Sequence, residues 1–311
     1  METAPFFEDI AFGPAGGAAH WLTTDDGVRI RVGHWPFADA KGTALMFPGR
    51  TEYIEKYGDA AREMQAHGYA SVAIDWRGQG IADRFLPERR LGHVGTFADY
   101  QKDVRAVMDH VRALGLPEPY YLVAHSMGGC IGLRALQEGL PVKAVMFSAP
   151  MWGITMAPLL RSAAWSAATI ARAVGRGDML APGQALETFV LREPFDTNTL
   201  TRDKEMFERL QTQMRAHPDL ALGGPTLHWL YESMTEMNRL ASTASPDLPC
   251  LTFLGTSENI VDPARIHDRM ARWPGGQLEV LQGGEHEVMH EIPAAREKVF
   301  AMTGAHFAAN T

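Results

Sequence analysis

Short apolar runs and amphipathic helical patterns alternate along the first half of the chain and again near its end. Continuous apolar runs are typical of strands buried on both faces of a parallel sheet. The segments between them carry apolar residues three and four positions apart, as amphipathic helices do. The expected strands are 44–47, 70–75, 120–123, 144–148, 250–254 and 278–281, and the expected helices are 57–67, 97–114, 127–138, 263–273 and 293–302. This alternation predicts an α/β fold with a mostly parallel central sheet and helices on both faces.

One long segment interrupts the alternation between two expected strands. Residues 151–246 show helical patterns and no clear strand. We therefore expect a single core made of residues 1–150 and 247–311, with residues 151–246 inserted as a helical cap or lid.

The predicted lid is rich in flexible and aromatic side chains. It carries seven of the 16 methionines, namely Met151, Met156, Met179, Met206, Met214, Met234 and Met237. Such residues suit an adaptable apolar surface over a hydrophobic substrate, although they also serve ordinary packing. The stretch Leu159–Val174 has a broad apolar face, which predicts either packing or peripheral contact with a membrane surface.

The segment Ala124–Gly129 lies where an expected strand passes into an expected helix. It places Ser126 between small residues, which is the sequence form of a nucleophile elbow, a turn that lifts one side chain clear of the backbone. We expect the positions two before and two after the serine to lie in near contact, so both must be small. They are Ala124 and Gly128, with alanine at the first glycine of the usual G-x-S-x-G pattern. The alternative is an ordinary loop with a serine N-cap.

Two further loops offer the partners that a nucleophilic serine needs. A serine hydroxyl requires an imidazole to accept its proton and a carboxylate to orient that imidazole. Loops at the carboxyl ends of parallel strands lie at one edge of the sheet. The loop after strand 250–254 contains Glu258 and Asp262, and the loop after strand 278–281 contains His286. The order serine, acid, histidine is that of the α/β-hydrolase fold.

The chain resembles the lysophospholipase and monoacylglycerol lipase group of α/β-hydrolases. The resemblance rests on residues 47–52, 75–80, 124–129 and 148–151 and on the acid and histidine loops. It implies a serine carboxylic-ester hydrolase that cleaves a monoacyl lipid through an acyl-enzyme intermediate, with no cofactor. A short-chain esterase or thioesterase of the same fold is the alternative. A non-catalytic ligand-binding protein of this fold is the alternative from another class.

The resemblance also assigns roles in a catalytic triad. It makes Ser126 the nucleophile and His286 its base, with His290 as the runner-up. It favours Glu258 as the acid, where many relatives have aspartate, and leaves Asp262 as the competitor.

An oxyanion hole is expected beside the triad. Its donors are the backbone N–H groups of Met127, directly after the nucleophile, and of Arg50, in the loop after strand 44–47. The Arg50 side chain is expected either to contact a polar or phosphate head group or to form a salt bridge with Glu52 or Glu55.

Residues 286–290 also spell H-E-x-x-H, the zinc-hydrolase signature, in which His286 and His290 bind the metal and Glu287 activates water. That motif needs a continuous helix and a third ligand. Here Gly283 and Gly284 precede it and Pro293 follows closely. The sequence therefore favours serine chemistry and predicts no metal.

Composition limits the possible partners and the location. The 311 residues are 46% hydrophobic and 21% charged, with a net charge of −8 and no lysine or arginine cluster, which argues against nucleic-acid binding. The first residues lack the features of a secretory signal, and no apolar stretch is long enough to span a bilayer. We expect a cytoplasmic protein, either free or peripheral at the inner face of the membrane. Cys130 and Cys250 are expected to be buried thiols rather than a disulfide. The sequence does not indicate an oligomeric state.

Overall fold

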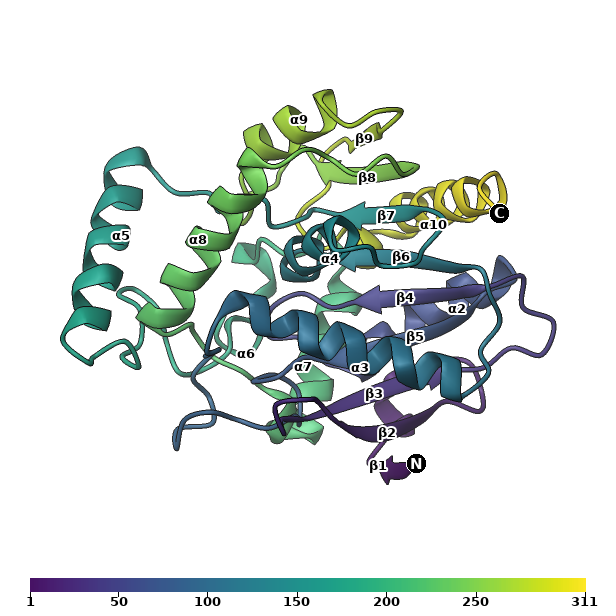
Figure 1. Ribbon diagram of the computed structural model, residues 1–311, viewed down its shortest axis with the longest axis horizontal. Helices are drawn as coiled ribbons and strands as arrows, with labels where there is room; N and C mark the ends of the chain where they lie inside the picture. Colours follow the sequence, from purple (N-terminus) through teal and green to yellow (C-terminus); the bar gives the residue numbers. More distant parts are fainter.

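A computed structural model describes residues 1–311 and contains one nine-stranded sheet (Figure 1). The strand order is β1-β2-β3-β5-β4-β6-β7-β8-β9. The strands are β1 (Glu2–Ala4), β2 (Ala18–Thr23), β3 (Arg29–Trp35), β4 (Thr43–Phe47), β5 (Ala70–Asp75), β6 (Tyr120–His125), β7 (Val145–Ser148), β8 (Cys250–Gly255) and β9 (Gln277–Leu281). The neighbouring pairs from β5 to β9 are parallel, which confirms the mostly parallel sheet.

The first three strands extend the sheet on one side in antiparallel fashion, and β3 pairs antiparallel with β5. The sequence pattern predicts no strand before residue 44, so β1, β2 and β3 are additional to the expected strands. In contrast, every residue of β4, β5, β6 and β7 is buried. These central strands are the continuous apolar runs that the sequence pattern predicts.

Helices cover both faces of the sheet. They are α1 (Glu8–Ala11), α2 (Gly58–Ala66), α3 (Tyr100–Ala113), α4 (Met127–Gln137), α5 (Pro158–Ala173), α6 (Phe189–Arg192), α7 (Lys204–Ala216), α8 (Leu227–Ser242), α9 (Pro263–Ala271) and α10 (Pro293–Ala308). Short 3-10 helices span Ile54–Tyr57, Phe97–Asp99, Phe195–Thr197, Pro218–Leu220 and Val288–His290. Figure 1 shows α3 and α4 in front of the sheet and α2 and α10 behind it.

The hydrophobic core has two layers, one on each side of the sheet. Within β6, Leu122 belongs to the larger buried cluster and Val123 to the smaller one. Successive strand residues point to opposite faces, so a strand buried on both faces needs apolar residues at consecutive positions. Cys130 and Cys250 are both buried and unpaired, as expected.

The segment between β7 and β8 contains α5, α6, α7 and α8 and no strand. Helix α5 packs against α8 and stands at the periphery of the molecule (Figure 1). Its outer side exposes large apolar residues, with Leu159 87% and Ile170 63% exposed. None of the helices is long and apolar enough to cross a membrane. The division of the chain into a core and a lid stays a prediction.

Candidate active site

Ser126 occupies a strained turn between β6 and α4. It has φ 50° and ψ −117°, a positive φ that costs a non-glycine residue about 1–3 kcal/mol. A Cβ atom at Gly128 would lie 2.0 Å from the carbonyl oxygen of Phe47. The backbone atoms nearest to that position belong to Phe47 and Pro48. The glycine is needed because the loop after β4 approaches the elbow closely.

The three residues assigned to the triad lie together. His286 Nε2 is 2.9 Å from Ser126 Oγ, and His286 Nδ1 is 2.7 Å from Glu258 Oε2. All three side chains are buried. This arrangement allows His286 to donate from Nδ1 to Glu258 while Nε2 accepts the serine proton.

The Glu258 carboxylate is held by its own backbone loop. Its Oε1 accepts hydrogen bonds from the N–H groups of Ile260 and Val261 at 2.6 and 3.0 Å. Burial raises the pKa of this carboxyl, but the charge and hydrogen bond of His286 and the two backbone donors outweigh burial and lower it. Glu258 is therefore ionised at neutral pH, as an orienting carboxylate must be.

The competing acid and base are engaged elsewhere. Asp262 is the N-cap of α9, where Oδ1 accepts from Ala264 N at 3.0 Å, and its Oδ2 lies 3.2 Å from Arg161. His290 Nε2 lies 3.3 Å from the carbonyl oxygen of Lys56. Neither side chain is hydrogen-bonded to Ser126 or His286.

The H-E-x-x-H segment does not form the helix that a zinc signature requires. Residues 286–287 lie in a loop, and only Val288–His290 form a 3-10 helix. Both ring nitrogens of His286 are engaged, and Glu287 accepts a hydrogen bond from Lys56. This geometry does not present His286 and His290 to a common metal.

The two expected oxyanion donors lie in the loops that meet at the elbow. The Arg50 N–H has no acceptor within the protein. Met127 is the first residue of α4, where N–H groups lack intrahelical acceptors. Trp76 Nε1 donates to the carbonyl oxygen of Pro48 at 2.9 Å, so the turn after β5 holds the Arg50 loop in place.

A buried charge network beneath the site was missed by the sequence analysis. Lys56 Nζ lies 2.6 Å from Glu52 Oε1 and 2.6 Å from Glu287 Oε1. Glu52 also accepts a hydrogen bond from Gly49 N at 2.5 Å. Glu287 directly follows His286, so the network joins the oxyanion loop to the histidine loop. No pattern along the chain points to the pairing of Lys56 with Glu287.

The charges in this network stabilise one another. Burial raises the pKa of Glu287, but the charges of Lys56 and His125 outweigh it and hold that pKa well below its usual range. The spacing of Glu52, His125 and Glu287 would also suit a metal ion. The ammonium of Lys56 already supplies the positive charge between the two carboxylates, so the residues do not call for a metal.

Two cavities meet at Ser126. The larger, of about 560 Å³, is mostly apolar and extends beneath α5; its lining includes Met151, Leu160, Ala164, Leu227 and Trp229. The smaller, of about 330 Å³, is more polar and extends toward α6 and α7.

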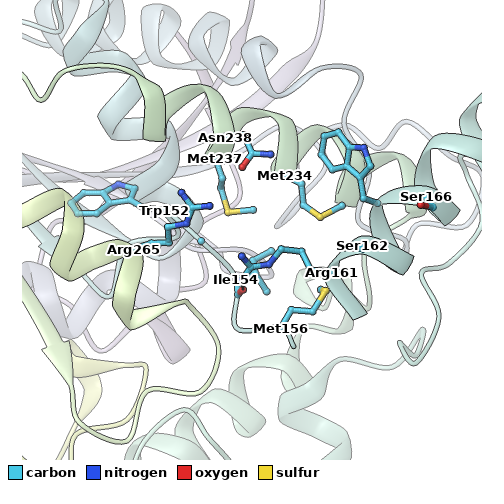
Figure 2. A pocket seen from close by; sticks show the side chains of 12 residues that line it. Trp152, Ile154, Met156, Arg161, Ser162, Ser166, Met234, Met237, Asn238 and Arg265 are labelled. Atoms are coloured by element: carbon cyan, nitrogen blue, oxygen red, sulfur yellow. Dashed lines mark hydrogen bonds between the residues drawn. The ribbon is translucent and has the colours of Figure 1, made fainter. Parts of the chain in front are cut away.

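A third cavity, of about 350 Å³, lies between α5 and α8 (Figure 2). In Figure 2, Met234 and Met237 point into it from α8, opposite Ile154 and Met156. Because Ile154 and Met156 line both this cavity and the 560 Å³ cavity, these two side chains separate the two spaces.

The Arg50 side chain lines both cavities that touch Ser126. Its Nη1 donates to the carbonyl oxygen of Gly223 at 2.8 Å, and its guanidinium lies 5.5 Å from the centre of the Trp229 ring. The salt bridge expected as one alternative does not form, because Glu52 pairs with Lys56 and Glu55 pairs with Arg31. Burial lowers the pKa of Arg50 to about 10. Arg50 is thus a cation beside the nucleophile without a carboxylate partner.

A serine on a nucleophile elbow, hydrogen-bonded to a histidine that a carboxylate orients, marks a serine hydrolase of the α/β-hydrolase fold. The chain belongs to the family described as serine aminopeptidase, S33, which its sequence matches over residues 38–293.

Similar proteins agree with that assignment. Lysophospholipase L2 of Escherichia coli K12 is 33% identical over 286 residues, which cover 88% of this chain and 83% of that protein. The probable lysophospholipase L2 of Haemophilus influenzae is 26% identical over 302 residues, covering 96% and 92%.

Solved structures share the fold. A soluble variant of monoglyceride lipase from Saccharomyces cerevisiae, in complex with a substrate analogue, superposes with a TM-score of 0.72 at 19% identity, covering 93% of this chain and 94% of the lipase. A thermostable carboxyl esterase from Bacillus coagulans superposes with a TM-score of 0.74 at 14% identity, covering 96% and 99%.

Proposed function

We propose that this chain is a carboxylic-ester hydrolase that cleaves monoacyl lipids, lysophospholipids first and monoacylglycerols second. One observation carries the proposal. An apolar cavity of about 560 Å³ and the Arg50 guanidinium, which has no carboxylate partner, both lie at Ser126. The cavity is suited to an acyl chain on one side of the scissile ester, and the guanidinium is suited to an anionic head group on the other. The similarity to lysophospholipase L2 supports the same assignment.

The reaction follows from the geometry of the triad. Ser126 Oγ attacks the acyl carbonyl carbon while His286 Nε2 takes the hydroxyl proton, and Glu258 stabilises the imidazolium. The carbonyl oxygen becomes an oxyanion that accepts hydrogen bonds from the N–H groups of Arg50 and Met127.

The intermediate then collapses to an acyl-enzyme. His286 returns its proton to the departing glycerol oxygen as the ester C–O bond breaks. Water next attacks the acyl carbonyl with His286 as base, and the fatty acid leaves as Ser126 regains its proton. These steps require no cofactor.

The two cavities divide the substrate between them. The apolar cavity beneath α5 would take the acyl chain, since burial of methylene groups is favourable there by about 0.8 kcal/mol each. The more polar cavity would take the head group, with Arg50 donating to its phosphate. Residues 151–246 would then act as the lid, because α5 and the segment before it form the apolar wall.

Helix α5 would bring this site to a lipid surface. Leu159 and Ile170 in α5 and Val174 at its C-cap are 87%, 63% and 65% exposed. Exposed apolar residues on a peripheral helix suit insertion at a membrane interface. Replacing Leu159 and Ile170 by serine should reduce co-sedimentation with phosphatidylethanolamine/phosphatidylglycerol vesicles, whereas Val280→Ser, at an exposed strand position, should not. Equal binding by all variants would refute the contact.

A substrate panel tests the function. Lysophosphatidylcholine, lysophosphatidylethanolamine, monooleoylglycerol, a long-chain acyl thioester and p-nitrophenyl acetate are compared, with Ser126→Ala as the control. We expect the highest kcat/KM on the lysophospholipids and loss of turnover in Ser126→Ala. Preference for the acetate or the thioester would refute the lipid assignment. No turnover by the folded wild-type protein would favour the non-catalytic alternative.

A further inference from the structure

Three histidines converge on the face of the sheet that α3 covers, away from Ser126. They are His20 in β2, His34 in β3 and His110 in α3 (Figure 1 shows the three elements). The ring centroids are 5.2 Å apart for His20 and His34, 5.0 Å for His20 and His110, and 6.5 Å for His34 and His110. One nitrogen from each ring lies within 4.8 Å of the other two.

The fold dictates this convergence. His20 pairs with Val32 across β2 and β3, and His34 lies two residues beyond Val32, so both imidazoles project from the same face. Helix α3 crosses that face and contacts β2, which brings His110 over them. Residues distant in sequence thus meet through regular secondary structure.

The cluster is separate from the catalytic site. The strand register runs from His34 in β3 through Val72 and Leu45 to Leu122 in β6. The cluster therefore lies three strands from β6, at the level of Leu122, which is four residues before Ser126. Strand spacing and rise place it roughly 20 Å from the nucleophile. Its chemistry is therefore independent of the ester cleavage proposed above.

Each ring has a buried nitrogen without a hydrogen-bond partner. These atoms are Nδ1 of His20, Nδ1 of His34 and Nε2 of His110. The His34 and His110 side chains are buried, and His20 is half-buried. A buried polar atom left unpaired costs about 1–3 kcal/mol, so three in one place call for a ligand that satisfies them together.

A metal ion bound by imidazole fits the spacing. A zinc ion about 2.0–2.1 Å from each ligating nitrogen lies roughly 3.2 Å from each ring centroid, so two rings that share it at the tetrahedral angle have centroids roughly 5.2 Å apart. The His20–His34 and His20–His110 separations match this value, whereas the 6.5 Å between His34 and His110 would have to shorten by roughly 1 Å when the ion binds.

We propose that His20, His34 and His110 bind one divalent transition-metal ion, Zn(II) in the first place, with the fourth position open on the half-buried side of His20. Imidazole ligands suit zinc, copper and nickel rather than magnesium or calcium. The ion would link β2, β3 and α3, so its binding should raise the stability of the chain.

The test is metal binding by the untagged full chain after chelator treatment and desalting. Titration against a chromophoric zinc indicator should show one equivalent of bound Zn(II), and the thermal midpoint should rise when zinc is added. His20→Ala and His110→Gln should each weaken binding by at least about 10–100-fold. His267→Gln, at an exposed position on α9, is the matched control and should bind normally.

Cobalt(II) and copper(II) spectra of the wild-type protein test the same site without a variant, so the test does not depend on a variant that folds. Visible d–d absorption of bound Co(II) and nitrogen hyperfine splitting of bound Cu(II) should report imidazole ligands. Substoichiometric zinc, spectra without nitrogen ligands, or binding that survives His20→Ala would each overturn the proposal.

Discussion

The carboxyl edge of the sheet and the helical segment 151–246 meet at Ser126 but are built differently. At the sheet edge, buried charged groups are fixed by short hydrogen bonds, such as the 2.7 Å contact of His286 with Glu258 and the two 2.6 Å contacts of Lys56. In the helical segment, the side chains that line the large cavity are mostly apolar, and α5 also exposes apolar residues outward.

The two regions therefore have different roles: the sheet edge determines the rate of reaction, and the helical segment determines which substrate is accepted. Hydrogen bonds are directional and hold reacting atoms in place, whereas hydrophobic contacts are non-directional and tolerate varied shapes. We therefore expect substitutions at the sheet edge to change kcat or stability, and substitutions in the helical segment to change which acyl chains are accepted.

The largest expected effect separates the two candidate acids at the sheet edge. Glu258→Ala should lower kcat by about 10³–10⁴-fold, because His286 loses the carboxylate that fixes its tautomer. Asp262→Ala removes the cap of α9 and the ion pair with Arg161, and should cost about 1–2 kcal/mol of stability with kcat within about twofold. Steady-state kinetics and urea denaturation of both variants make the comparison. A larger loss of kcat in Asp262→Ala would assign the acid to Asp262.

The second prediction concerns the buried network. Lys56→Met removes the ammonium between the buried Glu52 and Glu287, leaving only His125 to offset their charges, and should lower the free energy of unfolding by about 3–5 kcal/mol. Arg62→Met breaks the exposed pair with Asp59 and should cost less than about 1 kcal/mol. Urea denaturation at neutral pH measures both. Equal stability of the two variants would show that the network contributes no more than a surface ion pair.

The third prediction tests the position where the two regions meet. Arg50→Gln keeps the backbone donor but loses the charge, so kcat/KM for lysophosphatidylcholine should fall by about 10–100-fold, as expected for a lost charge-assisted hydrogen bond. Activity on monooleoylglycerol should change by less than about threefold, and Arg50→Lys should retain part of the phosphate preference. Equal losses on both substrates would mean that the side chain supports the oxyanion loop instead.

The smallest effect is expected in the helical segment. Met156→Ala should join the 560 Å³ cavity to the cavity of Figure 2, because Met156 lines both. Each methylene newly buried contributes about 0.8 kcal/mol, so the kcat/KM ratio of a C18 to a C12 ester should rise by about three- to tenfold. Met179→Ala, at an exposed methionine, is the control. An unchanged ratio in Met156→Ala would show that this side chain does not limit acyl length.

The sequence predicts the sheet and the order of the site residues because local patterns encode them. Ser126 and Glu258 follow buried, mostly apolar strands, His286 follows β9, and parallel strands bring their carboxyl ends to one edge. The choice of Glu258 over Asp262 as the acid rested on the resemblance, and the contact with His286 agrees with it.

Contacts between loops that are distant along the chain could not be predicted from the sequence. Lys56 and Glu287 are 231 positions apart, and no local pattern relates them. The salt bridge expected as one alternative for Arg50 does not form, for the same reason. Lys56 pairs with Glu52 and Arg31 pairs with Glu55, and both pairings depend on tertiary structure. The three-histidine cluster likewise arises from strand register and helix crossing rather than from spacing along the chain.

Covalent labelling shows whether Ser126 is the nucleophile of a monoacyl-lipid hydrolase. The wild-type protein is treated with a long-chain alkyl fluorophosphonate and analysed by intact mass and peptide mapping, with and without lysophosphatidylcholine as competitor. We expect one adduct per chain, on Ser126, that lysophosphatidylcholine suppresses and that Ser126→Ala lacks. Ester hydrolysis that persists without an adduct on Ser126 would contradict it.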